Sequence, residues 1–130
     1  MSHDNEILPL VNARGDVIGR ASRHDCHQGP GLLHPVVHLH VFNRDGEIYL
    51  QKRSAVKDVF PGYWDTAVGG HIADAETPEE ALVREAREEI GLMGFIPQAL
   101  GTHTIDTRYE SEFVYVYAAR YDGPLHPNPD

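Results

Sequence analysis

The stretch GHIADAETPEEALVREAREEIGL, residues 70–92, determines how the rest of this 130-residue chain is interpreted. It is typical of a single helix, because Thr77 can cap, Pro78 suits the first helical position and Glu80 completes a capping box. Gly91 supplies the matching stop. Apolar side chains fall on one helical face that we expect to be buried, namely Leu82, Val83, Ala86 and Ile90. The stretch therefore predicts a loop followed by one helix.

Three glutamates of this helix, Glu85, Glu88 and Glu89, are spaced so that their side chains project toward one point. Three like charges this close destabilise a helix unless something positive meets them, and hard divalent cations prefer carboxylate oxygens. Taken alone, however, such a cluster is more often a solvated surface rich in glutamate. The cluster by itself leaves both interpretations open.

The complete pattern resembles the signature box of the Nudix hydrolase family. Gly70 is followed after five residues by Glu76, and after seven more by an Arg-Glu-Ala-x-Glu-Glu-x-Gly-Leu run that contains Gly91. Ala86 stands where the family often carries a larger aliphatic residue, which is a mild departure. The resemblance implies a loop-helix-loop that binds Mg²⁺ or Mn²⁺ and holds a diphosphate while water attacks phosphorus. The implied metal ligands are Glu85, Glu88 and Glu89.

The chemistry of a diphosphate explains why these residue types are needed. Its negative charge repels a nucleophile, and divalent ions offset that charge and make bound water more acidic. A carboxylate of the cluster can then accept the proton of water, although which of the three glutamates does so stays open. By resemblance, Arg84 would orient Glu85 and pair with Glu76. Without catalysis, Arg84 could instead form a surface ion pair with Glu80 or Glu88.

Length and composition limit the remaining possibilities. The 130 residues are expected to form one domain, 1–130, which is large enough for a real core. A formal net charge of −9 disfavours a polyanionic partner such as a nucleic-acid polymer. Cys26 is the only cysteine, which excludes an intrachain disulfide. The N-terminal residues lack a signal-peptide pattern and no apolar run is long enough to span a membrane, so a cytoplasmic protein is expected.

Hydrophobic alternation outside the helix predicts strands. A hairpin is expected over residues 7–21, followed by a short helix capped by Ser22 that carries Cys26 and His27. Residues 34–43 should form a strand with Val37, Leu39 and Val41 on one face. Further strands are expected at residues 47–53, around residues 101–108 and at residues 112–120. Strands, helix and strands in this order predict an α/β fold with a mixed sheet.

The resemblance implies that this fold is the Nudix α/β/α sandwich. After Arg120 the chain becomes turn-like and then stops, where relatives normally continue with another strand and a helix. We therefore expect either a shortened chain that lacks these C-terminal elements or a partner that supplies them. Exposed sheet surface at that end would favour association, so both a monomer and a homodimer are compatible with the sequence.

Three features outside the box resemble the branch that contains isopentenyl diphosphate isomerase and related hydrolases. They are LVNARGDVIG at residues 10–19, GLLH at residues 31–34, and QKRSAVKDVFPGYWDTAVGGH at residues 51–71. This branch implies a second metal site for Mn²⁺, Zn²⁺ or Fe²⁺, a choice that suits mixed imidazole and carboxylate ligands. Its ligands would be His27, His34, His71, Glu110 and Glu112. The alternative is a chain that is simply rich in histidine; His38, His40 and His103 have no such match and are expected to be structural.

One departure from this branch concerns Gly69. The isomerase carries an acid–base cysteine two residues before the histidine that corresponds to His71, and Cys26 lies elsewhere. Protonating and deprotonating carbon requires both an acid and a base, and only Glu112 remains of that pair. Gly69 therefore argues against isomerase activity.

The substrate contacts implied by the same resemblance are Arg53 and Lys57, whose cationic groups suit diphosphate oxygens. Trp64 would either line the pocket or pack under the helix. The leading hypothesis is a Mg²⁺- or Mn²⁺-dependent hydrolase that cleaves the phosphoanhydride bond of a small molecule, such as a nucleoside diphosphate or its derivative. The alternatives are residual isomerase activity and a non-catalytic domain that binds a metabolite.

Overall fold

The signature stretch folds into one helix, α2 (Pro78–Ile90), in the computed structural model, which describes residues 5–52 and 64–127. The Thr77 hydroxyl accepts a hydrogen bond from the Glu80 backbone amide, and the Glu80 carboxylate accepts one from the Thr77 amide, which completes the capping box. Gly91 ends the helix in the left-handed conformation, with φ of 66°. These start and stop signals are as predicted.

The predicted buried face of α2 is wrong at one position. Leu82, Ala86 and Ile90 are fully buried, but Val83 is 53% exposed and Ala81 is buried in its place. Successive helical residues are about 100° apart, so Val83 lies past the edge of the stripe that faces the sheet. The buried face of α2 therefore includes Ala81 at one edge and leaves out Val83 at the other.

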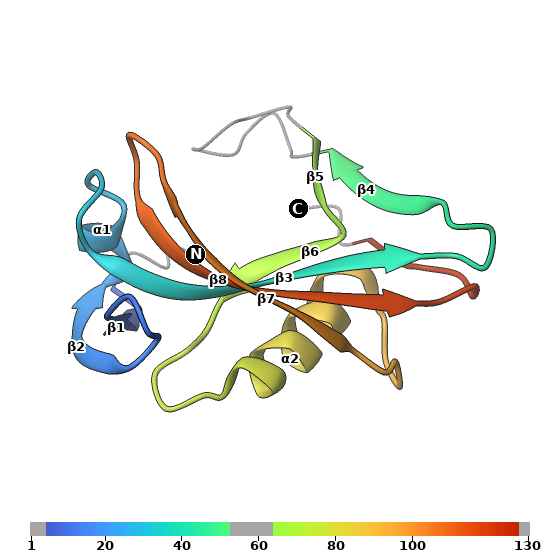
Figure 1. Ribbon diagram of the computed structural model, residues 1–130, viewed down its shortest axis with the longest axis horizontal. Coiled ribbons are helices and arrows are strands. Elements are labelled where there is room, and N and C mark those ends of the chain that lie inside the picture. The colour runs from blue at the N-terminus through green and yellow to red at the C-terminus, as the bar shows by residue number, and fades with distance from the viewer. Residues whose placement is uncertain (1–4, 53–63, 128–130) are drawn as a thin grey trace.

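The strands form a hairpin and a mixed sheet (Figure 1). The hairpin consists of β1 (Ile7–Val11) and β2 (Val17–Ser22), and it leads into the four-residue helix α1 (Arg23–Cys26). The larger sheet has the order β5-β4-β3-β8-β7, with β6 also paired to β3. Its strands are β3 (Leu33–Phe42), β4 (Ile48–Lys52), β5 (Trp64–Thr66), β6 (Val68–His71), β7 (Gln98–Asp106) and β8 (Ser111–Arg120).

The sheet is mixed because β3 runs parallel to β8 and antiparallel to β4 and β6. Its topology confirms the predicted α/β class, and α2 is the one long helix in ranges 5–52 and 64–127. Figure 1 shows α2 against one face of the sheet, while α1 and the hairpin lie at the end where β3 begins. None of the helices in these ranges has both the length and the apolar character needed to cross a bilayer.

The two faces of β3 have different roles. Val37, Leu39 and Val41 point to the α2 side and join the main core, as their alternation predicts. His34 and His38 point to the opposite face, and the strand pairing places Gly69 of β6 beside His38. The sheet therefore separates a packed apolar layer from a face that carries histidines.

Candidate active site

Arg84 joins the loop, the helix and strand β6. Its Nε and Nη2 atoms donate to the two carboxylate oxygens of Glu76, each at 2.9 Å. Its Nη1 donates to Glu85 Oε1 at 2.6 Å, and Nη2 also donates to the carbonyl oxygen of His71 at 3.1 Å. The Arg84 hydrogen bonds hold the pKa of Glu76 below its usual value, and the same contacts raise that of Arg84. Glu76 and the His71 carbonyl thus hold the Arg84 side chain, which in turn holds the Glu85 carboxylate.

Arg84 makes contacts that belong to both interpretations that the sequence left open. It pairs with Glu76 and Glu85, as the resemblance implies, and it also forms the surface ion pair with Glu88 Oε2 at 3.5 Å. Glu80 closes the capping box instead. The His71 carbonyl is a partner that the sequence did not reveal, because a backbone acceptor has no residue-type signal.

Gly70 is needed because the Glu85 carboxyl group lies where a side chain would stand. A Cβ atom added at Gly70 would lie 2.7 Å from Glu85 Oε1 and closer still to Cδ and Oε2. A side chain at residue 70 would therefore fit only if the Glu85 carboxyl group moved away. The glycine that begins the signature box therefore lets the helix carboxylate approach the backbone of β6.

The three glutamates of the cluster differ in exposure. The Glu85 side chain is 16% exposed and that of Glu88 is 51% exposed. Glu89 is half-buried, with its Oε2 atom inside the protein. Glu85 and Glu89 follow buried Ala81 at i+4 and i+8, so they lie along the edge of the buried face. The Glu85 carboxylate lies between α2 and β6, Glu89 is partly buried, and Glu88 borders solvent.

Replacing Arg84 with Ala should destabilise the fold by about 1–3 kcal/mol, because two shielded carboxylates would lose their shared cation. The estimate allows for the 30% exposure of the arginine side chain. Urea denaturation followed by circular dichroism would measure the loss. An Arg87→Ala variant is the control, since Arg87 is exposed on the same helix. Equal stability of both variants would contradict the role given to Arg84.

A second cluster lies at the beginning of β3, where four ligand atoms come within 4.8 Å of one another. His27 follows α1, His34 is on β3, His71 ends β6, and Glu110 precedes β8. The three imidazole rings have centroids 5.2–5.8 Å apart. Four segments that are distant in sequence thus meet at one point.

The chemistry of this cluster fits a metal ion. His34 Nδ1 lies 3.1 Å from the Leu32 carbonyl oxygen, which assigns the ring proton to Nδ1 and leaves Nε2 facing Glu110 Oε1 at 3.1 Å. His27 Nε2 is buried 3.3 Å from the same oxygen and makes no well-formed hydrogen bond to the described part of the chain. A ligand histidine whose other nitrogen donates to a carbonyl is typical of metal sites. Three imidazoles and a carboxylate suit Mn²⁺, Zn²⁺ or Fe²⁺.

The electrostatics differ between the histidines of the cluster. Burial lowers the pKa of His34, but the hydrogen bond with Glu110 outweighs it and raises that pKa above its usual value. Burial and the nearby His34 lower the pKa of His71 to about 3, so this imidazole is neutral at pH 7. Burial alone would raise the pKa of Glu110, but the adjacent imidazoles of His27 and His34 hold it well below its usual value. A neutral imidazole and an ionised carboxylate are the forms that bind a cation.

Glu112 is the fifth predicted ligand, and it has a different setting. It stands opposite His34 in the register between β3 and β8, but within the described ranges it is outside the group of four atoms. Burial and the charge of Glu110 raise the pKa of Glu112 to about 7. The structure thus places Glu112 beside the cluster as a carboxyl group that can hold a proton.

The predicted substrate residues cannot be assigned positions at the site. Arg53 and Lys57 fall outside the described residues. Trp64 begins β5, and its side chain is also outside the description. Of the remaining histidines, His103 is exposed on β7, while His38 and His40 are half-buried on β3.

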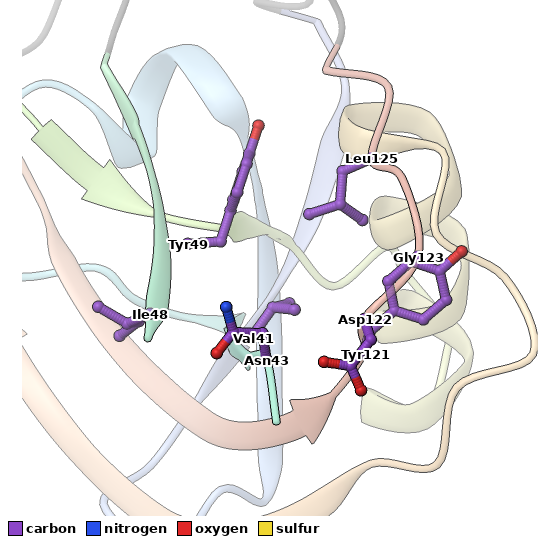
Figure 2. A pocket seen from close by; sticks show the side chains of 8 residues that line it. All are labelled: Val41, Asn43, Ile48, Tyr49, Tyr121, Asp122, Gly123 and Leu125. Atoms are coloured by element: carbon purple, nitrogen blue, oxygen red, sulfur yellow. The ribbon is translucent and has the colours of Figure 1, made fainter. Parts of the chain in front are cut away.

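A pocket of about 320 Å³ lies at the opposite end of β3 (Figure 2). Tyr49 and Leu125 line it from two sides. Two of its polar residues have partners, since Asn43 donates to Glu47 within its turn and Asp122 accepts a hydrogen bond from the Arg44 amide. None of the described residues that line this pocket is cationic, so it does not suit a diphosphate.

Comparison with known proteins agrees with this geometry. The NUDIX domain family matches residues 32–130. An uncharacterised Nudix hydrolase of Rhodococcus erythropolis is 33% identical over 96% of this chain and 72% of its own length. An isopentenyl-diphosphate Delta-isomerase of Streptomyces avermitilis is 31% identical over 95% of this chain and 66% of its own length.

Solved structures give the same result. The crystal structure of DR0079 from Deinococcus radiodurans has a TM-score of 0.80 at 33% identity, covering 95% of this chain and 77% of that one. The chain belongs to the Nudix family. It spans between 50% and 73% of the length of several curated relatives, so activity and substrate are matters for proposal.

Proposed function

We propose that the protein is a divalent-metal-dependent hydrolase that cleaves the phosphoanhydride bond of a nucleoside diphosphate or a related small molecule. The observation that carries this proposal is the placement of the Glu85 carboxylate by Arg84 against the bare backbone of Gly70. An acidic helix with only a structural role would not require an arginine that holds the Glu85 carboxylate where a side chain of residue 70 would stand.

The residues of the box have distinct roles in this proposal. Glu85, Glu88 and Glu89 would hold Mg²⁺ or Mn²⁺, which when bound offsets the charge of the diphosphate and acidifies water. Arg84 orients the Glu85 carboxylate. Glu88, the most exposed of the three, is best placed to take a proton from water at the solvent boundary. Arg53 and Lys57 are proposed to contact the phosphates, and Trp64 to line the pocket.

The cluster of His27, His34, His71 and Glu110 is proposed as the second metal site, with Glu112 beside it. Its donor set and its buried His27 Nε2 support this assignment. A carboxyl group with a pKa of about 7 next to that site can hold or release a proton at neutral pH.

Isomerase activity is the second candidate, since relatives named as isopentenyl-diphosphate Delta-isomerases match most of the chain. Against it, Gly69 offers no acid or base at the position where the resemblance requires a cysteine. We therefore rank hydrolysis first.

A panel of diphosphates tests the proposal. The wild-type protein would be incubated with Mg²⁺ and, separately, ADP, CDP, GDP, UDP, a nucleotide sugar and isopentenyl diphosphate. Release of nucleoside monophosphates is expected. Formation of dimethylallyl diphosphate would instead favour the isomerase, and binding without any product would favour a metabolite-binding domain.

Addition of Mn²⁺ or Zn²⁺ to the metal-free protein should raise its thermal midpoint, since a ligand at 100 times its dissociation constant stabilises by about 2.7 kcal/mol. Differential scanning calorimetry would measure this shift. A His71→Gln variant should lose most of it, because one imidazole nitrogen of the cluster is removed. The control is His103→Gln, which alters an exposed histidine of β7. An equal shift in all three proteins would contradict the proposed metal site.

A further inference from the structure

The loop of residues 28–32 connects two members of the proposed metal cluster, His27 and His34. His34 lies within β3, whose pairing with β8 holds its backbone. His27 follows the four-residue helix α1, so its position depends on the course of the loop. Gly29 and Gly31 have φ of 121° and 129°, and a glycine backbone is free to adopt many other conformations. The position of His27 therefore requires contacts that fix this loop.

Ser111 supplies one of these contacts from the first position of β8. Its Oγ accepts a hydrogen bond from the Gly31 amide at 2.8 Å, and its hydroxyl donates to Asp106 Oδ1 at 2.5 Å. Ser111 is only 4% exposed, so this hydroxyl is shielded from water. Removing a shielded hydrogen-bond partner is costly, because water does not readily replace it. The Ser111 side chain thus links the loop to the end of β7.

The turn between β7 and β8 carries Glu110 and is bonded to the same loop. The Gly29 amide donates to the carbonyl oxygen of Tyr109 at 2.9 Å. Within the turn, the Glu110 amide donates to Thr107 Oγ1 at 3.2 Å, and the Thr107 amide donates to the Glu110 carbonyl oxygen at 2.9 Å. Together with the bond to Ser111, these contacts hold the loop against the turn that contains Glu110.

The distances within the cluster show what this link can control. The Nε2 atoms of His27 and His34 lie 3.3 Å and 3.1 Å from Glu110 Oε1. Metal ligands must be held within about 0.5 Å of their working geometry by supporting contacts. His71 has a different support, since the pairing of β6 with β3 holds its backbone. His27 is thus the ligand whose position depends on the loop.

We propose that Ser111 and Asp106 are positioning residues for the metal cluster, which hold the loop of residues 28–32 so that the His27 imidazole stays beside Glu110. The inference rests on the proposed second metal site and adds to it two residues that act through His27. A hydroxyl suits this role because it can accept from an amide and donate to a carboxylate at the same time. Asp106 acts as an acceptor, so its charge is not required.

Isothermal titration calorimetry with Zn²⁺ tests this role on protein freed of transition metals. Excess Mg²⁺ would be present to occupy the glutamates of α2, because hard cations prefer carboxylate oxygens. Ser111→Ala removes the link, and Asp106→Ala removes its acceptor at an exposed position where the fold should tolerate the change. Asp106→Asn is the conservative variant, since its amide oxygen can still accept. Thr102→Ala is the control, because it deletes an exposed hydroxyl of β7.

Ser111→Ala should weaken Zn²⁺ affinity by about tenfold to 100-fold, as is typical when a partner that orients metal ligands is lost. Asp106→Ala should weaken it by about three- to tenfold, the effect of one hydrogen bond. Asp106→Asn and Thr102→Ala should stay within about twofold of wild type. A role in stability alone would instead lower the thermal midpoint of the protein without Zn²⁺ and leave the affinity of the folded protein unchanged.

A double-mutant comparison shows whether the effect passes through His27. In a His27→Gln background, Ser111→Ala should cause no further loss of Zn²⁺ affinity, because the ligand that it positions is already absent. In a His71→Gln background, Ser111→Ala should keep its full effect. The Asp106→Ala variant would be compared in the same two backgrounds, and it decides the outcome if Ser111→Ala does not fold.

The remaining outcomes separate this inference from the metal site itself. Wild-type Zn²⁺ affinity in Ser111→Ala and Asp106→Ala would overturn the positioning role and leave the metal site intact. An equal further loss in the His27→Gln and His71→Gln backgrounds would also overturn it, because the effect would then not pass through His27. Failure of the wild-type protein to bind Zn²⁺ would refute the proposed metal site, and the positioning role with it.

Discussion

Replacing Glu88 with Gln is expected to lower kcat for nucleoside diphosphate hydrolysis by about 100-fold to 10,000-fold, the contribution of a positioned base. Glutamine keeps the shape of the side chain but cannot take a proton and binds a divalent cation weakly. The Glu88 side chain is 51% exposed and its contact with Arg84 is long, so the folded structure should be retained. Steady-state assays of phosphate release in Mg²⁺ would measure the change.

The matched control is Glu79→Gln in the first turn of the same helix. It makes the same change of charge, but Glu79 has a 3.4 Å contact with the Tyr117 hydroxyl and is not in the signature cluster. Its kcat should remain within about twofold of wild type, as for a surface substitution outside the site. If the two variants were equally active, Glu88 would have no part in the reaction.

Replacing Gly70 with Ala is the second change with a large expected effect. The new Cβ atom would overlap the Glu85 carboxyl group, so that side chain must leave Arg84. Loss of the charged hydrogen bond between Arg84 and Glu85 should cost about 1–3 kcal/mol, and the displaced carboxylate should also abolish most of the turnover. Thermal denaturation and the same phosphate assay would record both losses.

Gly69→Ala provides the comparison for this variant. The two glycines are adjacent on β6, but a methyl group at residue 69 meets its neighbours at 3.5 Å or more. Only the substitution at Gly70 should therefore reduce stability and kcat. A Gly70→Ala protein with normal stability and turnover would show that the close approach of Glu85 is not needed.

The parts of the fold that the sequence predicts are those determined by local interactions. The limits of α2 follow from Thr77, Glu80 and Gly91, whose side chain or backbone acts within one helical turn. The alternation of β3 similarly assigns Val37 to the core face and His34 to the other. Val83 was assigned wrongly because apolar spacing does not fix the direction in which a helix faces its sheet.

The sequence pattern alone does not predict contacts between residues that are far apart in the chain. The meeting of His27 with Glu110 depends on how α1 and the segment before β8 approach the start of β3, and only the family resemblance brought these residues together in advance. The close approach of the Glu85 carboxyl group to Gly70 depends on the packing distance between α2 and β6, which the sequence does not give.

Hydrolysis in water enriched in ¹⁸O tests the central claim most directly. The protein, Mg²⁺ and a nucleoside diphosphate would be incubated in labelled water, and the products analysed by mass spectrometry. Attack of water on phosphorus predicts a nucleoside monophosphate and a phosphate, one of which carries a single ¹⁸O atom. Absence of hydrolysis products across all the diphosphates, or conversion of isopentenyl diphosphate to its isomer instead, would contradict the assignment as a hydrolase.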